Sequence, residues 1–191
     1  MRTNFRSLRM LLSLALVVVA VTVVAAQTVA NGPYYALPSW AQKLPSTTRF
    51  IVLANWNNEA VLDRETGLVW EREPPMTMHQ WRAAVRLCPL GRVTGGRMGW
   101  RLPSIHELAS LLDPSKVYPA SALPDGHPFV NVDDVHAAYW SATSSASTDP
   151  VNDAWFVIPP NAAGFRVAII EKTNPAIRVW CVRGPSNADA Y

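Results

Sequence analysis

Residues 96–115 constrain the fold more than any other stretch of this chain. A glycine-rich turn leads into Trp100, and a short amphipathic helix is predicted to follow. Ser104 and Glu107 have the spacing of a capping box at a helix N-terminus. Pro103 disfavours helical backbone in the residue before it, so the helix should not begin earlier. Apolar residues at helical spacing then define one buried face: Ile105, Leu108, Leu111 and Leu112.

A second helix is expected upstream, over residues 78–88. Thr77 followed by Gln80 forms another capping box, so the helix is predicted to begin directly after Thr77. Its buried face follows the i, i+3, i+4, i+7 pattern and consists of Trp81, Ala84, Val85 and Cys88. Pro89 and Gly91 are expected to end it.

Most of the remaining chain is predicted to form short strands, because it is rich in β-branched and aromatic residues. Residues 60–63 and 68–70 are expected to pair as a hairpin, with Gly67 supplying a positive φ in the turn. Further strands are predicted over residues 49–53, 139–142, 154–158, 164–171 and 176–183, the last two as a hairpin across 172–175. Two helices followed by a strand-rich half predict an α+β fold rather than a doubly wound sheet.

The N-terminus has the pattern of a secretory signal. Three arginines precede an apolar run over residues 10–24, and small residues lead to a predicted cleavage after Ala26. The run is short for a membrane span, which needs roughly 20 apolar residues, so export with cleavage is favoured over an uncleaved anchor. We therefore expect a secreted or periplasmic protein with no stable membrane insertion after cleavage.

Four segments are predicted from these patterns. A signal peptide covers residues 1–26, and an extended arm with the first strand covers residues 27–59. One folded domain follows over residues 60–184, and residues 185–191 are expected to form a disordered tail. About 165 residues remain after cleavage, which suits one domain with a sizeable core.

The chain has two cysteines, Cys88 and Cys181. An exported protein folds under oxidising conditions, so a disulfide is favoured over two buried thiols. The two residues are 93 positions apart (181 minus 88), and closing such a loop stabilises by up to about 4–5 kcal/mol in the chain-entropy model.

Cleavage also changes the charge balance. The chain has 17 Lys+Arg and 14 Asp+Glu, but three of the arginines and none of the acids lie in residues 1–26. The mature part thus has 14 of each and no net charge, which removes support for nucleic-acid binding.

Four blocks in this order resemble the family of the C-terminal domain of the collagen-like adhesin Lcl. The blocks are Val61-Leu62-Asp63-x-x-Thr66-Gly67-Leu68-Val69-Trp70, Gly99-Trp100-Arg101-Leu102-Pro103-Ser104 with Glu107-Leu108, Trp140-Ser141-Ala142-Thr143, and Trp180-Cys181-Val182-Arg183. The resemblance covers roughly residues 60–184. It implies a C-type lectin-like fold, with two helices on small antiparallel sheets and a long loop region. It also implies a disulfide from the first helix to the last strand, where Cys88 and Cys181 are expected.

Five arginines are candidates for holding an anionic polymer such as a sulfated glycan. They occur in a stretch that contains no acid between Pro74 and His106, and they are Arg82, Arg86, Arg92, Arg97 and Arg101. The simpler interpretation is a solvated face plus one or two structural arginines.

Two loop regions, residues 116–138 and 143–153, are the other candidates for ligand binding. They contain Asp125 and His127 in the first loop, and Asn152 and Asp153 beside Trp155 in the second. Loop carboxylates are also calcium ligands, but turn capping by aspartate is the commoner explanation. The histidines lack zinc-ligand spacing, which argues against a metalloenzyme. No resident metal or cofactor is expected, and calcium is the less favoured alternative. The element tryptophans are expected mainly in the core.

These observations favour an exported, non-catalytic module that binds a glycan, a surface polymer or a protein. Two alternatives remain: an envelope enzyme or enzyme accessory that uses Asp and His of the long loop, and a purely structural envelope component. Convergence of Asp125, His127, Asp133 and Asp153 in one pocket would favour the enzyme.

Overall fold

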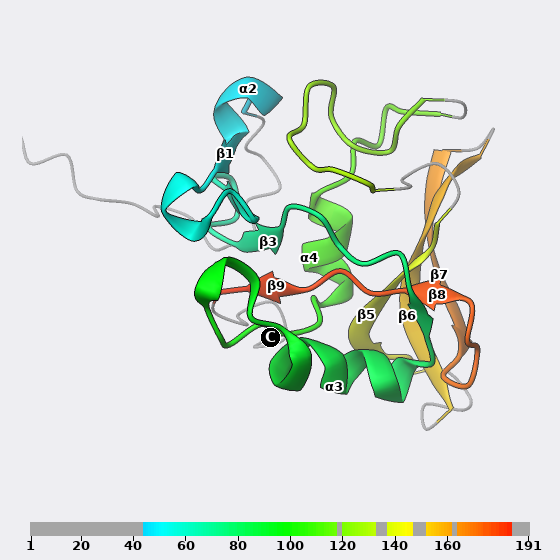
Figure 1. Cartoon of the computed structure of the whole chain (residues 1–191). Helices are drawn as coiled ribbons and strands as arrows, with labels where there is room; N and C mark the ends of the chain where they lie inside the picture. Colours follow the sequence, from blue (N-terminus) through cyan, green and yellow to red (C-terminus); the bar gives the residue numbers. More distant parts are fainter. Residues whose placement is uncertain (1–43, 118–119, 133–136, 147–151, 162–163, 185–191) are drawn as a thin grey trace, which may run out of the picture. The chain divides into compact units, whose positions relative to one another are not determined.

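The computed structural model describes residues 44–184, apart from 118–119, 133–136, 147–151 and 162–163 (Figure 1). The predicted signal peptide, most of the predicted arm, the predicted tail and Asp133 lie outside the described residues. Among the residues described, no helix is long and apolar enough to cross a membrane.

The first sheet has four antiparallel strands in the order β1-β2-β3-β9. Its strands are β1 (Phe50–Val52), β2 (Ala60–Asp63), β3 (Val69–Glu71) and β9 (Val182–Arg183). The predicted hairpin is confirmed, because β2 pairs with β3 and Gly67 has a φ of 72° in the connecting turn. Asp63 fixes that turn: its buried carboxylate accepts hydrogen bonds from Arg49, the Glu65 N–H and the Thr66 hydroxyl.

The second sheet has five strands in the order β4-β8-β5-β6-β7. These strands are β4 (Met78–His79), β5 (Tyr139–Ser144), β6 (Asp153–Asn161), β7 (Gly164–Glu171) and β8 (Ile177–Arg178). β5 and β8 run parallel, and the other neighbouring pairs are antiparallel.

The predicted hairpin between residues 164–171 and 176–183 is wrong. β7 pairs with β6, and the last segment divides into β8 in one sheet and β9 in the other (Figure 1). Every residue from Ile177 to Val182 is buried, as expected of a segment enclosed between two layers rather than the outer strand of a hairpin. Local alternation of residue types could not reveal this, because both arrangements require an extended chain.

Two longer helices accompany short helical turns. The bounds are α2 (Ser46–Arg49), α3 (Trp81–Gly91) and α4 (Ile105–Ser110), with 3-10 turns η1 (Ala54–Trp56) and η2 (Thr94–Gly96). The capping box of α4 is confirmed, since Ser104 accepts from the Glu107 N–H and Glu107 accepts from the Ser104 N–H.

The predicted start of the first helix is wrong, and its last residue is Gly91 rather than Cys88. Met78 and His79 pair with β8 instead of forming a first helical turn, and Gln80 is the N-cap of α3. The hydroxyl of Thr77 contacts the His79 ring rather than capping the helix. Pro89 lies inside the last turn, and the helix continues to Gly91.

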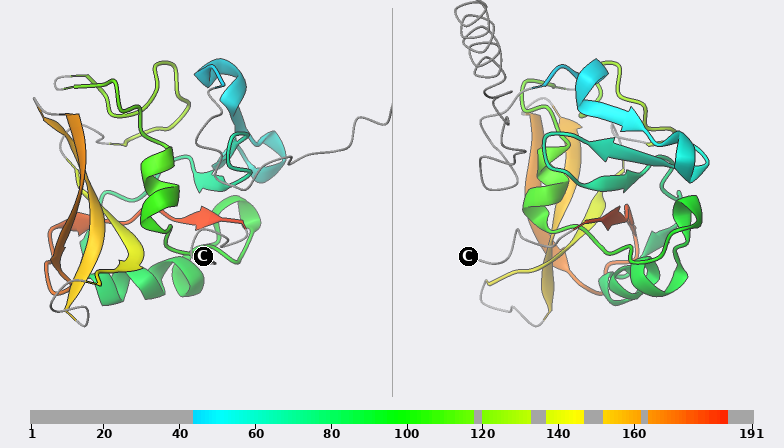
Figure 2. Two further views of the ribbon diagram at one scale, coloured as in Figure 1. Left: turned by 180° about the vertical axis from the view of Figure 1, so that it is seen from behind. Right: turned by 90° about the vertical axis from the view of Figure 1, so that its left-hand side faces the viewer.

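Apolar side chains form two cores. The first, here called the Trp180 core, contains Trp70, Phe129, Tyr139 and Trp180, whose rings are in edge or tilted contact. The second, here called the Trp140 core, contains Trp100, Trp140, Phe156 and both cysteines. Helix α4 contacts β5 and β6, and α3 crosses one end of the second sheet in contact with β5 (Figures 1 and 2). Helices and mixed sheets arranged in this way agree with the α+β prediction.

Candidate functional site

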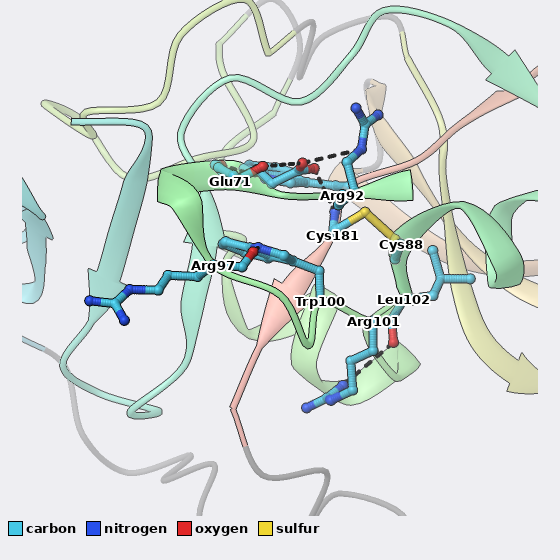
Figure 3. The surroundings of a disulfide bond; sticks show 10 residues. Glu71, Cys88, Arg92, Arg97, Trp100, Arg101, Leu102 and Cys181 are labelled. Atoms are coloured by element: carbon cyan, nitrogen blue, oxygen red, sulfur yellow. Dashed lines mark hydrogen bonds and ion pairs between the residues drawn. A yellow bond between two sulfur atoms is a disulfide. The ribbon is translucent and has the colours of Figure 1, made fainter. Parts of the chain in front are cut away.

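A disulfide joins α3 to the segment between β8 and β9 (Figure 3). Cys88 and Cys181 are fully buried, with Cα atoms 5.6 Å apart, which confirms the predicted bond. A crosslink across 93 residues ties the first half of the domain to its last strands and thereby restricts the unfolded chain strongly.

Glu71 lies beside the disulfide and is 2% exposed. Its main chain and its side chain both hold Cys181: the Glu71 N–H donates to the Cys181 carbonyl, and the Cys181 N–H donates to Glu71 Oε2 at 3.0 Å. The Thr94 hydroxyl donates to Oε1, and Arg92 Nε lies 3.3 Å from the same oxygen, without hydrogen-bond geometry. Burial raises the pKa of the Glu71 carboxyl, against the lowering by its donors and Arg92.

The buried residues at the disulfide, Glu71, Cys88, Trp180 and Cys181, are here called the junction. A surface next to the junction combines an aromatic ring with two cations. Arg97 and Arg183 place their guanidinium carbons 5.5 and 5.4 Å from the centre of the Trp56 ring. The ring is half-buried and packs edge-on against Trp100. A glycine is required at position 95 for Trp56 to pack there, because a Cβ on residue 95 would lie 2.8 Å from the Trp56 Cβ. We call Trp56, Arg97 and Arg183 the Trp56 surface.

The Trp56 surface has the chemistry of an anion site. Arg183 Nε donates to the Met98 carbonyl, which fixes the guanidinium beside the ring. Within the described part of the chain, neither Arg97 nor Arg183 forms an ion pair with a carboxylate. Two like charges against one indole favour a bound anion that neutralises them, and planar guanidinium groups suit sulfate, phosphate and carboxylate oxygens. The exposed Met98 adds apolar contact next to them.

The arginine run does not form one continuous basic face. Figure 3 shows Arg92, Arg97 and Arg101 directed apart, from different points of the chain. Arg92 lies on Glu71, and Arg101 forms a two-pronged ion pair with Glu107 of the α4 capping box. These two arginines therefore have structural partners, as the simpler interpretation anticipated. Arg82 and Arg86 are exposed on α3 and stay predictions.

The long-loop candidates are tied into the fold. Asp125 is exposed, pairs with Lys116 at 2.6 Å, and accepts a hydrogen bond on its carbonyl from the Ser46 hydroxyl. The half-buried His127 ring lies 5.9 Å from the Phe129 ring. A role of either residue in binding stays a prediction.

The candidates of the second loop lie at the start of β6. Asn152 is exposed and its carbonyl accepts from the Lys172 N–H, while the half-buried Trp155 packs against the Trp180 core. Asp153 lines an open groove of about 620 Å³ together with Glu171. Neither Asp125 nor His127 lines this groove, so the structure does not bring these three residues into one pocket.

Among the described residues, no group of three or more His, Cys, Asp or Glu side chains is arranged to hold a metal ion. Of the carboxylates considered for calcium, Asp125 pairs with Lys116, and Asp153 lies opposite Glu171 on the neighbouring strand.

Two residues of the Trp56 surface, Trp56 and Arg183, were not among the binding candidates expected from the sequence. One local signal was available in the sequence, the pair Asn57-Asn58 directly after Trp56; both residues adopt a positive φ in the structure. Asparagine is among the few residues that tolerate this conformation, and such strain concentrates at functional sites. Arg183 carried no comparable signal, because its position beside Trp56 depends on β9 joining the first sheet.

The family model described as the Lcl C-terminal domain matches residues 59–183, about two thirds of the chain. The match begins just before β2 and ends with β9, so it includes the disulfide and most of both cores. No curated protein matches the chain significantly.

Proposed function

We propose a binding function for this protein from one premise: the chain belongs to the Lcl C-terminal domain family. Membership indicates an adhesin-like or surface-associated module. We infer that the module binds an anionic surface polymer, such as a sulfated glycan, and performs no catalysis, with neither calcium nor a cofactor.

The observation that carries this proposal is the pair of guanidinium groups against the Trp56 ring. An aromatic ring gives a flat apolar contact for a sugar face, and the two arginines supply charge-assisted hydrogen bonds to anionic substituents. The glycine turn and the junction beneath are fixed by the disulfide and Glu71, so little ordering is required when a ligand binds.

A C-type lectin-like fold is part of the proposal. Two helices, two sheets and a disulfide between the longer helix and the last strands support it. Folds of this kind act as rigid platforms for recognition, but the fold alone does not select the ligand.

We also propose that the protein is exported, with cleavage near Ala26, and acts in the periplasm or outside the cell. The basic and apolar N-terminal pattern and the paired cysteines support this location. A mature chain without net charge argues against nucleic acid as the partner. A surface protein is the other partner class that the exposed loops could accommodate.

Heparin-column retention and a sulfated-glycan array test the proposal. The double variant Arg97→Gln/Arg183→Gln should elute at clearly lower salt and bind at least about tenfold more weakly, because two charge-assisted contacts are lost. Arg82→Gln/Arg86→Gln is the matched control, since it removes the same charge from the exposed face of α3.

The two variants separate a specific site from general attraction. Equal losses in both would mean that diffuse charge, not the Trp56 surface, holds the polymer. If the heparin column does not retain the wild type at low salt, an anionic ligand is excluded. The glycan array would then identify a neutral glycan or no glycan at all.

A further inference from the structure

Strand β7 forms an open edge of the second sheet. It is eight residues long, and in the described part of the chain it pairs on one side only, with β6. The stretch from Val167 to Ile170 contains no charged residue and no proline. Proteins usually protect an exposed sheet edge with such residues. An edge of this kind is a template for another strand.

The register identifies the backbone groups that face outward. The Lys172 N–H donates to the Asn152 carbonyl, and Asp153 to Val157 pair in register with Glu171 to Val167. Hydrogen-bonded pairs alternate with non-bonded pairs in an antiparallel ladder. Ala168 and Ile170 therefore bond to β6, whereas Val167, Ile169 and Glu171 direct their N–H and C=O groups to the free edge.

The side chains along this edge offer apolar contact. Val167 and Ile169 are 38% and 40% exposed, while Ala168 and Ile170 pack against the Trp140 core on the opposite face. The open groove of about 620 Å³ is lined by Ile169, Ile170 and Glu171 in succession. The same groove is also lined by Asp153 of β6 and by residues 173–175 of the following turn, so it lies at the end of β7 next to that turn.

The groove is acidic at one end. Asp153 and Glu171 are direct cross-strand neighbours and both line it. The neighbouring cation, Lys172, places its ammonium 4.5 Å from the centre of the Trp81 ring on α3. A segment that follows the edge toward the turn after Glu171 is thus met by two carboxylates, which favour a lysine or arginine at that end.

We propose that β7 accepts an extended segment of a partner protein as an additional strand. The segment has apolar residues at alternate positions, which face Val167 and Ile169, and a basic residue opposite Asp153 and Glu171. This goes beyond the proposed glycan function, because it assigns a second surface with a different class of ligand. Main-chain hydrogen bonds supply affinity, and the apolar and acidic contacts supply specificity.

Amide hydrogen exchange by NMR on the full chain tests whether the edge is open. The amides of Val167, Ile169 and Glu171 should exchange at least about tenfold faster than those of Ala168 and Ile170, because only the latter are bonded to β6. Equal protection of all five would overturn the proposal, since another segment or a second copy would then occupy the edge. Concentration dependence of that protection would identify the second copy.

Selection from a phage-displayed random decapeptide library tests the ligand. Peptides bound by the wild type should show alternating β-branched or aromatic residues with Lys or Arg at one end. They should slow exchange of the three outward amides and bind Ile169→Pro at least about tenfold more weakly, because proline removes an outward N–H without breaking a bond to β6. Glu171→Lys should weaken binding similarly, with Glu73→Lys, an exposed acid outside the groove, as its matched control.

Three results would contradict this model of the edge. They are no enriched peptide, enriched peptides that bind Ile169→Pro as tightly as the wild type, and equal binding of peptides N-methylated at alternate residues. None of these results bears on heparin retention, so failure here is distinguishable from failure of the proposed function.

Discussion

The junction around the disulfide and the β6–β7 hairpin are built in opposite ways. At the junction, Glu71, Cys88, Trp180 and Cys181 come from segments far apart in sequence, and all four are buried. The Glu71 carbonyl accepts from the Trp180 indole, and the Glu71 carboxylate accepts from the Cys181 N–H. The hairpin consists of two neighbouring segments, and its outer strand leaves one side of its backbone unpaired among the described residues.

This difference separates stability from recognition. Contacts that close long loops contribute most to a unique fold, and their polar groups must be satisfied because they are buried. A local hairpin tolerates an open edge because its own register already fixes it. Changes at the junction should therefore affect folding, and changes on the hairpin should affect binding alone.

The largest loss of stability is expected from Trp180→Ala. The indole touches Trp70, Phe129 and Tyr139, and its removal leaves a cavity in the Trp180 core. The free energy of unfolding should fall by about 3–5 kcal/mol in chemical denaturation. A loss below about 1 kcal/mol, typical of surface sites, would show that the core does not depend on this residue.

Removal of the disulfide ranks second. Cys88→Ala/Cys181→Ala should lower the unfolding free energy by about 2–5 kcal/mol, because the unfolded chain regains the freedom of a long loop. Thermal unfolding with and without reductant provides the measurement. Reductant should lower the melting temperature of the wild type and leave that of the double variant unchanged, and an insensitive wild type would refute the role of the bond.

Glu71→Gln should produce a smaller effect with a defined sign. Since burial raises the pKa of Glu71 in the folded state, ionisation opposes folding. The protonated Glu71 carboxyl contributes to the unfolding free energy. This contribution is complete below the unfolded-state pKa of 4.5, and it is lost as the pH rises through the higher folded-state pKa. The unfolding free energy of the wild type relative to Glu71→Gln should therefore decrease with increasing pH. An increase would mean that the ion pair with Arg92 outweighs burial.

The smallest change in stability is expected on the hairpin. Ile169→Thr keeps a β-branched side chain on an exposed position of β7, so the unfolding free energy should stay within about 0.5 kcal/mol of the wild type. Denaturation of the two proteins side by side measures the difference. A loss above about 2 kcal/mol would place Ile169 in a core and would contradict the contrast between the hairpin and the junction.

The sequence predicts the local parts of this fold well. The α4 capping box and the turn at Gly67 are confirmed because each depends on residues within a few positions of one another. The disulfide was predicted from the expected export of the protein and from the presence of two cysteines. Strand partners were harder: β4 and β8 are two residues long, and their pairing displaced the predicted start of α3.

The candidate site was less predictable, for a related reason. Arg97 belonged to the arginine run, but Trp56 reaches it from η1, between β1 and β2, and Arg183 reaches it from β9 at the end of the domain. Helices and strands leave a periodic pattern of apolar residues in the sequence, but a contact between a guanidinium and a ring distant in sequence leaves none. Only the neighbouring pair Asn57-Asn58, of a residue type that tolerates a positive φ, marks the position locally.

The division of residues 177–183 between the two sheets has a consequence for biosynthesis. While the ribosome still holds this segment, the emerging polypeptide lacks β8 and β9, the indole of Trp180 and one of its two thiols. Native closure must therefore wait until almost the whole domain has been released, and a chaperone that delays collapse until then would protect the nascent chain from aggregation.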